Sequence, residues 1–148
     1  AAAEMLAAGV EPPLVYQEVF ERNSPALVRL GGIALAGLRL EEGGKLAWIS
    51  LTRDQIAACQ AESEDTSEVI NQLLTVDGVR LAVLFKELPV GRTKLSFRSK
   101  GELDVNSLAA RFSGGGHTNA AGAVVDGALA GTVERVLPLC RELLRQPV

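Results

Sequence analysis

The stretch VRLAVLFKELPVGRTKLSFRS, residues 79–99, decides the fold. Seven of its first ten residues are apolar, five of them consecutive at 81–85, which is typical of a strand in the middle of a sheet. The Pro-Val-Gly that follows predicts a turn. Residues 93–99 then alternate, so that Lys94, Ser96 and Arg98 should share one face of the returning strand. The stretch therefore predicts two strands at the centre of a sheet, the second with a polar face.

Further strands and helices are expected on both sides of this pair. Asp104 is placed to cap a short helix, and residues 65–68 resemble a capping box. A closing helix is expected despite Pro138 within it. The chain should therefore be an α/β protein, with a mixed sheet of four to five strands flanked by helices. Strands are expected at residues 45–51 and 121–125, and helices at 52–59, 65–77, 104–112 and 132–144.

The first 41 residues read as helices that precede this domain. Ser24 followed by Pro25 is a typical N-cap and first-turn pair. The turn-like residues 41–44 mark the expected boundary, which gives linker helices over 1–41 and a domain over 42–148. Helices are expected at residues 1–8, 12–22 and 24–38, and the second should turn Leu14, Val15, Val19 and Phe20 toward the core.

Composition narrows the class of protein. Hydrophobic residues make up 47% of the 148-residue chain, enough for a real core. Cys59 and Cys140 lie too far apart for a zinc motif and give no disulfide framework, which favours a reducing cytoplasm. The longest apolar run is too short to cross a bilayer, and we expect neither a signal peptide nor membrane association.

Charge is unevenly distributed along the chain. Residues 1–79 carry 5 Lys or Arg and 12 Asp or Glu, whereas residues 80–111 carry 7 and 3, and residues 112–148 carry 3 and 3. The positive block leads directly into a glycine-rich stretch. This pattern favours a local anionic ligand over a protein that coats long nucleic acids.

That stretch, GGGHTNAAG at residues 114–122, contains the only histidine of the chain. Three glycines in a row disfavour a regular helix or strand, and their N–H groups can form an anion-binding nest. The side chains of His117, Thr118 and Asn119 can all hydrogen-bond a phosphate. The alternative is a tight turn between a helix and a strand, with Asn119 stabilising the turn.

Four motifs in order, SFRSKG (96–101), DVNSLAARF (104–112), GGGH (114–117) and NAAGA (119–123), resemble the DHH-associated domain of DHH-family phosphoesterases. Within that family they are most similar to the bifunctional oligoribonuclease and PAP phosphatase group. Fainter similarity extends over nearly the whole chain. Ser113 departs from the pattern, because the family usually has a fourth glycine there.

The resemblance implies a substrate-binding role for this chain. Arg98 would hold a nucleotide through its planar guanidinium fork, and His117 would contact phosphate. A catalytic DHH domain would precede Ala1 in a parent hydrolase that uses manganese and degrades very short RNA or phosphorylated nucleotides. Assembly is left open, a homodimer included. The implied substrate-binding residues are Arg98, Ser99, Lys100, Gly114, Gly115, Gly116, His117 and Asn119.

Catalytic residues are not expected within this chain, because it has no visible cluster of carboxylates and histidines for a two-metal site. The pattern reads as substrate capture without the chemistry. Two other classes stay open. The chain could be a nucleotide-sensing module that catalyses nothing, or a protein-interaction domain in which the glycines only shape a turn.

Overall fold

The computed structural model describes residue 6 and residues 8–146. Its centre is a six-stranded sheet in the order β1-β2-β3-β4-β6-β5. β2 and β3 run parallel, and the other neighbouring strands are antiparallel. The strands are β1 (Arg39–Glu41), β2 (Leu46–Leu51), β3 (Leu81–Leu88), β4 (Arg92–Ser99), β5 (Gly115–His117) and β6 (Ala120–Asp126).

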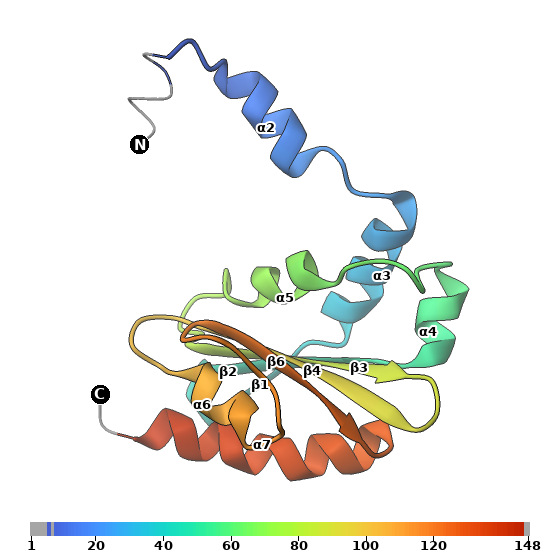
Figure 1. Ribbon diagram of the computed structural model, residues 1–148, viewed down its shortest axis with the longest axis vertical. Coiled ribbons are helices and arrows are strands. Elements are labelled where there is room, and N and C mark those ends of the chain that lie inside the picture. The colour runs from blue at the N-terminus through green and yellow to red at the C-terminus, as the bar shows by residue number, and fades with distance from the viewer. Residues whose placement is uncertain (1–5, 7, 147–148) are drawn as a thin grey trace.

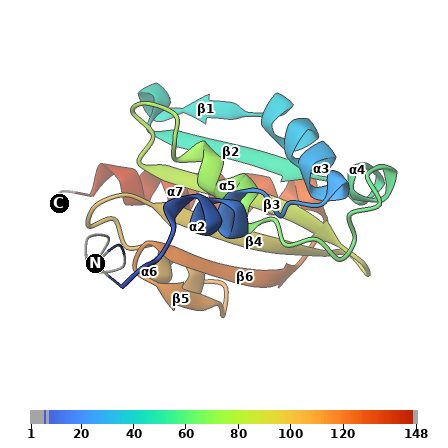
Figure 2. The same ribbon diagram turned by 90° about the horizontal axis from the view of Figure 1, so that it is seen from above.

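Helices lie on both faces of the sheet (Figures 1 and 2). α3, α4 and α5 cover one face, which we name the α5 face, and α6 and α7 cover the opposite one, the α7 face. α2 extends away from these layers. The helices are α2 (Pro12–Phe20), α3 (Pro25–Ala36), α4 (Arg53–Ala58), α5 (Ser67–Leu73), α6 (Val105–Ala110) and α7 (Leu129–Arg145), and the 3-10 turn η1 spans Glu42–Gly44.

Two apolar cores follow from this layering. On the α7 face, Phe85 and Phe97 are fully buried beneath residues of α6 and α7. On the α5 face, Leu30 of α3 and Ile70 of α5 pack against apolar residues of β2 and β3. Each core includes the residues on one side of β3, so both sides of this strand are buried. This explains why the sequence of the strand is mostly apolar.

The expected α/β class and mixed sheet are confirmed, with six strands where four to five were expected. The strands that the sequence did not locate, β1 and β5, have only three residues each. The alternation in β4 is confirmed, since Leu95 and Phe97 are buried and Lys94 is exposed. The capping roles of Ser24, Thr52 and Asp104 are also confirmed. Their side chains accept bonds from the backbone N–H groups of Leu27, Gln55, and Asn106 and Ser107, respectively.

Two expectations about the helices need correction. The exposed fractions of Leu14 and Val15 are 56% and 44%, so these residues do not reach the core. The cause is the position of α2, which extends from the sheet instead of packing on it (Figure 1). In α5, the capping box expected at residues 65–68 does not form: the N-cap is Thr66, whose side chain makes no cap bond, and Asp65 before it accepts from the N–H of Ser67.

The other expectations at the N-terminus are not tested. The side chains of Val19 and Phe20 lie outside the described ones, as does most of the helix expected at residues 1–8. The division of the chain between residues 41 and 42 stays a prediction, although β1 is itself a strand of the sheet and α3 packs on the sheet. Among the described residues, no helix has the length and apolar character needed to cross a membrane.

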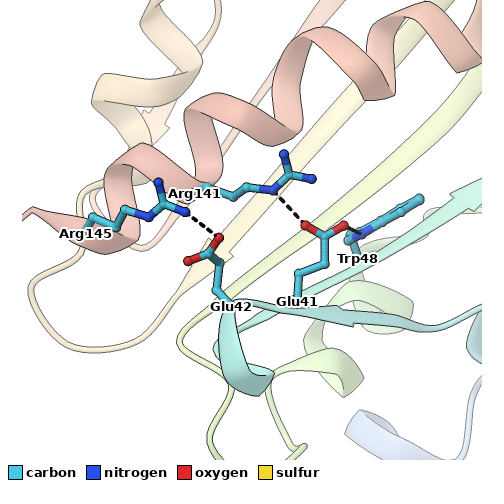
Figure 3. Close-up of polar contacts among 5 residues, drawn as sticks. All are labelled: Glu41, Glu42, Trp48, Arg141 and Arg145. Atoms are coloured by element: carbon cyan, nitrogen blue, oxygen red, sulfur yellow. Dashed lines mark hydrogen bonds and ion pairs between the residues drawn. The ribbon is translucent and has the colours of Figure 1, made fainter.

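Ion pairs fasten α7 to the edge of the sheet (Figure 3). Nε of Arg141 donates to Oε2 of Glu41 at 2.8 Å, and Nε1 of Trp48 donates to the other carboxylate oxygen at 2.9 Å. These hydrogen bonds, that from Arg141 first, lower the pKa of Glu41 below its ordinary value. One turn further along α7, Arg145 pairs with Glu42 at 2.8 Å. The pairs therefore hold the last turns of α7 against β1 and η1.

Candidate functional site

The α5 face of the sheet changes from apolar to polar between β3 and β4. Ala82 and Leu84 of β3 belong to the core beneath α5. Their partners across the ladder are Arg98 and Ser96 of β4, and Lys94 lies opposite Lys86. Directly paired residues point to the same face of a sheet. The part of this face formed by β4, β6 and β5 therefore carries mostly polar and small residues, with the exposed Val124 of β6 as an exception, and we name it the open face.

Strand register places the predicted Arg98 and His117 in one row of the open face. Arg98 pairs with Ala120 of β6, and Ala120 pairs with His117 of β5. Two strand spacings of about 4.8 Å separate the backbones of Arg98 and His117 by roughly 10 Å. A small residue, Ala120, thus lies between two side chains that can donate hydrogen bonds.

The next row contains only small residues. Ser96 pairs with Gly122, which in turn pairs with Gly115. The two rows together form a shallow surface with no large side chain in its middle, bordered by Arg98 on β4 and His117 on β5. This arrangement brings together two segments that lie about 20 residues apart in the sequence.

The guanidinium of Arg98 is held from two sides. Its Nε donates to Oδ1 of Asn71 on α5 at 3.2 Å, and its Nη1 donates to the carbonyl oxygen of Phe97 at 3.0 Å. Arginine has five N–H groups, so three of them are not used by these two bonds. The side chain is partly buried and keeps donors for a further acceptor.

The glycine run forms strand β5, contrary to the expectation that it would avoid regular structure. The reason is close packing on β6. A Cβ at Gly114 would lie 2.2 Å from the carbonyl oxygen of Gly122, and one at Gly116 would lie 2.4 Å from that of Ala120. At Gly115 the nearest atom, Oδ1 of Asn106, would be 3.7 Å away. Packing therefore explains two of the three glycines and leaves the third without a steric cause.

Ser99 and Asn119 make contacts within the protein. Ser99 is buried, and its Oγ donates to the carbonyl oxygen of Leu103 at 2.6 Å. Nδ2 of Asn119 donates to Oγ of Ser99 and to the carbonyl oxygen of Gly101, both at 2.9 Å. These bonds favour the turn-stabilising alternative for Asn119. Substrate contacts by Ser99, Asn119 and the exposed Lys100 stay predictions.

Two lysines continue the polar surface away from Arg98. Lys86 is almost fully buried, and its Nζ donates to the carbonyl oxygen of Glu64 at 3.2 Å. Burial, followed by the charge of Lys94, lowers the pKa of Lys86. The carboxylate of Asp65 offsets part of the positive charge of Lys86 and Lys94. Hydrogen bonds from Ser67 lower the pKa of the Asp65 carboxyl group. Because acidic groups already lie beside these lysines, the stronger candidate for an anion site is the row of Arg98 and His117.

Asn71 is the residue of the site that the sequence did not reveal. It precedes Arg98 by 27 positions and belongs to another layer of the structure.

Elsewhere in the chain, burial raises the pKa of the Cys140 thiol to about 12. Within the described residues, no group of three or more His, Cys, Asp or Glu side chains could hold a metal ion. Those residues therefore offer no fit for the manganese that the resemblance implies.

Comparison with known protein families identifies the family to which this chain belongs. The profile of the DHHA1 domain matches residues 54–146, which include β3, β4, β5 and β6. The chain belongs to the DHHA1 domain family. The match covers α5 and the whole open face, but not α3 or β1.

Curated relatives agree with this assignment. The chain is 33% identical over 147 residues to the "Bifunctional oligoribonuclease and PAP phosphatase NrnA" of Thermus thermophilus, covering 97% of this chain and 42% of that protein. It is 30% identical over 119 residues to the protein of the same name from Bacillus subtilis, covering 78% of this chain and 37% of that protein. The chain thus spans about two fifths of the length of these relatives.

A solved structure shares nearly the whole fold. An exopolyphosphatase-related protein from Bacteroides fragilis superposes with a TM-score of 0.86 at 29% sequence identity, covering 98% of this chain and 44% of that one. The C-Ala domain of Aquifex aeolicus alanyl-tRNA synthetase has a TM-score of 0.52 at 11% identity, a likeness of fold alone. The DHHA1 fold is therefore shared by proteins of different named activities, and function has to be argued from the site.

Proposed function

We propose that this chain is the substrate-binding part of a metal-dependent phosphoesterase that degrades very short oligoribonucleotides and dephosphorylates 3′-phosphoadenosine 5′-phosphate. The observation that carries the proposal is the row of Arg98, Ala120 and His117 on the open face. The names of the two curated relatives support the choice of substrates.

The chemistry of this row suits a phosphate. A guanidinium fork matches two phosphate oxygens, and an imidazole N–H donates to a third. Ala120 between them leaves room for the ligand, and the small residues of the next row give a flat surface for a sugar or base. The shallow surface would hold one or two nucleotides and present the scissile bond to a catalytic part elsewhere.

Manganese and the hydrolytic step belong to that catalytic part in this proposal. When bound, a divalent metal would supply an activated water and stabilise charge on the phosphoryl group. The residues of this chain would bind and orient the substrate. We therefore expect no phosphodiester hydrolysis by the chain alone with added manganese, and turnover that disappears in His117→Ala would contradict this division of roles.

Binding measurements test the proposal directly. The 148-residue chain is titrated with the 5′-phosphorylated dinucleotide pApA, and backbone and side-chain shifts are followed by NMR. Arg98→Ala and His117→Ala should each weaken binding about 10- to 150-fold, the range expected when a charge-assisted hydrogen bond worth roughly 1.5–3 kcal/mol is lost. Affinity should also fall steeply with salt.

Arg39→Gln is the matched control. It removes one positive charge from β1, at the far edge of the sheet, where Arg39 pairs with Trp48 on the α7 face. We expect binding to stay at the level of the unaltered chain. Equal losses in Arg39→Gln and Arg98→Ala, or shifts that cluster on α2 and α3, would contradict a phosphate site on the open face.

A further inference from the structure

We infer that Asn71 is a positioning residue for Arg98, which it orients toward a phosphate bound on the open face. The contact joins two layers of the structure, because Asn71 lies on α5 and Arg98 on β4. This role depends on the proposed function, since Asn71 acts on the same nucleotide site through Arg98.

The two bonds to the guanidinium have different origins. Phe97, whose carbonyl oxygen accepts from Nη1, is the chain neighbour of Arg98 and gives only a local anchor. Asn71 accepts from Nε at 3.2 Å and fixes the other side of the guanidinium plane. A long, partly exposed arginine loses rotamer freedom when it binds a ligand. A second anchor reduces that loss, because the fork is already oriented before the phosphate arrives.

Asn71 is itself held in place. Its Nδ2 lies 3.5 Å from Oε1 of Glu68, one helical turn earlier, which directs the amide oxygen toward Arg98. Val69, Ile70 and Leu73 of α5 are buried in the core. The helix is therefore fixed against the sheet by packing, and Asn71 has a stable base from which to reach Arg98.

The choice of a neutral acceptor fits a site for anions. An aspartate in the place of Asn71 would accept the same bond, but its charge would pair with the guanidinium and repel a phosphate. The amide oxygen orients Arg98 without cancelling its charge. Asn71 thus serves the ligand through Arg98, and it needs no contact of its own with substrate.

A double-mutant cycle separates this role from a general structural one. Binding of pApA by the 148-residue chain is compared among four proteins: unaltered, Asn71→Ala, Arg98→Ala and the double variant. Asn71→Ala should weaken binding about 2- to 10-fold, the loss expected for one hydrogen bond. In the Arg98→Ala background the same change should have no further effect, because residues that act as one unit are not additive.

Gln72→Ala is the matched control, since Gln72 is an exposed amide residue next to Asn71 on α5. It should bind like the unaltered chain. The Nε–H signal of Arg98, identified by its absence in Arg98→Lys, gives a second measurement. It should exchange slowly with solvent in the unaltered chain and in Gln72→Ala, and rapidly in Asn71→Ala.

The outcomes distinguish the two proposals. An additive loss in the double variant, or an unchanged Nε–H signal in Asn71→Ala, would overturn the role of Asn71 and leave the nucleotide site intact. Failure of the unaltered chain to bind pApA, or unchanged binding by Arg98→Ala, would overturn the proposed function and the role of Asn71 together.

Discussion

The two faces of β4 carry opposite chemistry within one strand of eight residues. Leu95 and Phe97 point to the α7 face and are fully buried, whereas Lys94 and Arg98 point to the open face. On the first face the side chains are enclosed by α6 and α7, and on the second the apolar layer stops at β3. Under the proposed function, one side of this strand therefore contributes to stability and the other to binding of the substrate.

Truncation of two neighbouring residues of β4 tests the contrast between its two faces most directly. Phe97→Ala should lower the free energy of unfolding by about 3–5 kcal/mol, because it leaves a cavity in a closed core. Arg98→Ala, one position further along, should lower it by less than about 1 kcal/mol. Urea denaturation of both variants measures the contrast. Similar losses in the two would mean that the open face contributes to the core as much as the α7 face does.

A second pair compares two neighbouring glycines at the start of β5, Gly114 just before the strand and Gly115 within it. Gly114→Ala places a Cβ 2.5 Å from that of Ala123, so backbone has to move, and we expect a loss of about 1–3 kcal/mol. Gly115→Ala meets no atom closer than 3.7 Å and should change the free energy of unfolding by less than about 0.5 kcal/mol. Thermal and urea melts test both.

The Gly115→Ala protein also tests the proposed binding role of the open face. Gly115 lies in the row of small residues with Ser96 and Gly122, and a Cβ there would have Oδ1 of Asn106 on α6 as its nearest atom. The methyl group would restrict the backbone whose N–H groups are proposed to contact phosphate. Binding of pApA should therefore weaken although the protein remains stable. Equal destabilisation by the two alanine substitutions would show that packing on β6 explains the whole glycine run.

Sequence patterns revealed the α7 face of β4 better than the open face. The alternation of residues 93–99 identified which side chains share a side, because that pattern depends only on strand geometry. Arg98 and His117 were singled out by the alternation and by the glycine-rich stretch, and the family resemblance implied their roles. Their common row could not be foreseen, because β5 has three residues, two of them glycine, and glycine weakens the signal for a strand.

Two other features depend on packing that no local pattern encodes. The bond between Asn71 and Arg98 joins residues 27 positions apart, and it exists because α5 happens to cross β3 and β4. In α2, periodicity suggested that Leu14 and Val15 belong to a core-facing side. Periodicity defines a helix face but not the partner that covers it, and the described residues near α2 leave both side chains exposed.

A third prediction concerns the ion pair that fastens α7 to the edge of the sheet. Glu41→Gln removes the charge that Arg141 and Trp48 contact, and should lower the free energy of unfolding by about 1 kcal/mol at pH 7. Because the pKa of Glu41 is lowered in the folded protein, its contribution is complete above the ordinary value of 4.5 and is lost as the pH falls through the folded pKa.

The pH dependence gives the decisive measurement for Glu41. Denaturation midpoints of the unaltered chain and Glu41→Gln should differ at pH 7 and converge below pH 4.5. Glu142→Gln serves as the control, since the pair of Glu142 with Arg111 is exposed and should contribute little. A constant difference over the whole pH range would mean that the carboxylate charge is not what holds α7 to β1.

The smallest expected effect lies at Ser113, where α6 ends and the chain turns toward β5. The N–H of Gly114 bonds to the carbonyl oxygen of Ala109 and that of Ser113 to Ala110, which is the pattern of a Schellman motif. Ser113 occupies the left-handed position of this motif with φ of 57°. A side chain there is unfavourable, and glycine removes that penalty while adding freedom to the unfolded chain.

Ser113→Gly should therefore raise the free energy of unfolding by about 0.5 kcal/mol and leave binding of pApA unchanged, because Ser113 lies outside the rows of the open face. Urea denaturation with Ser107→Gly, a helix-interior control expected to destabilise the protein, tests the sign. A lower stability in Ser113→Gly would mean that the serine side chain supports the turn, and the entry into β5 would then depend on more than backbone geometry.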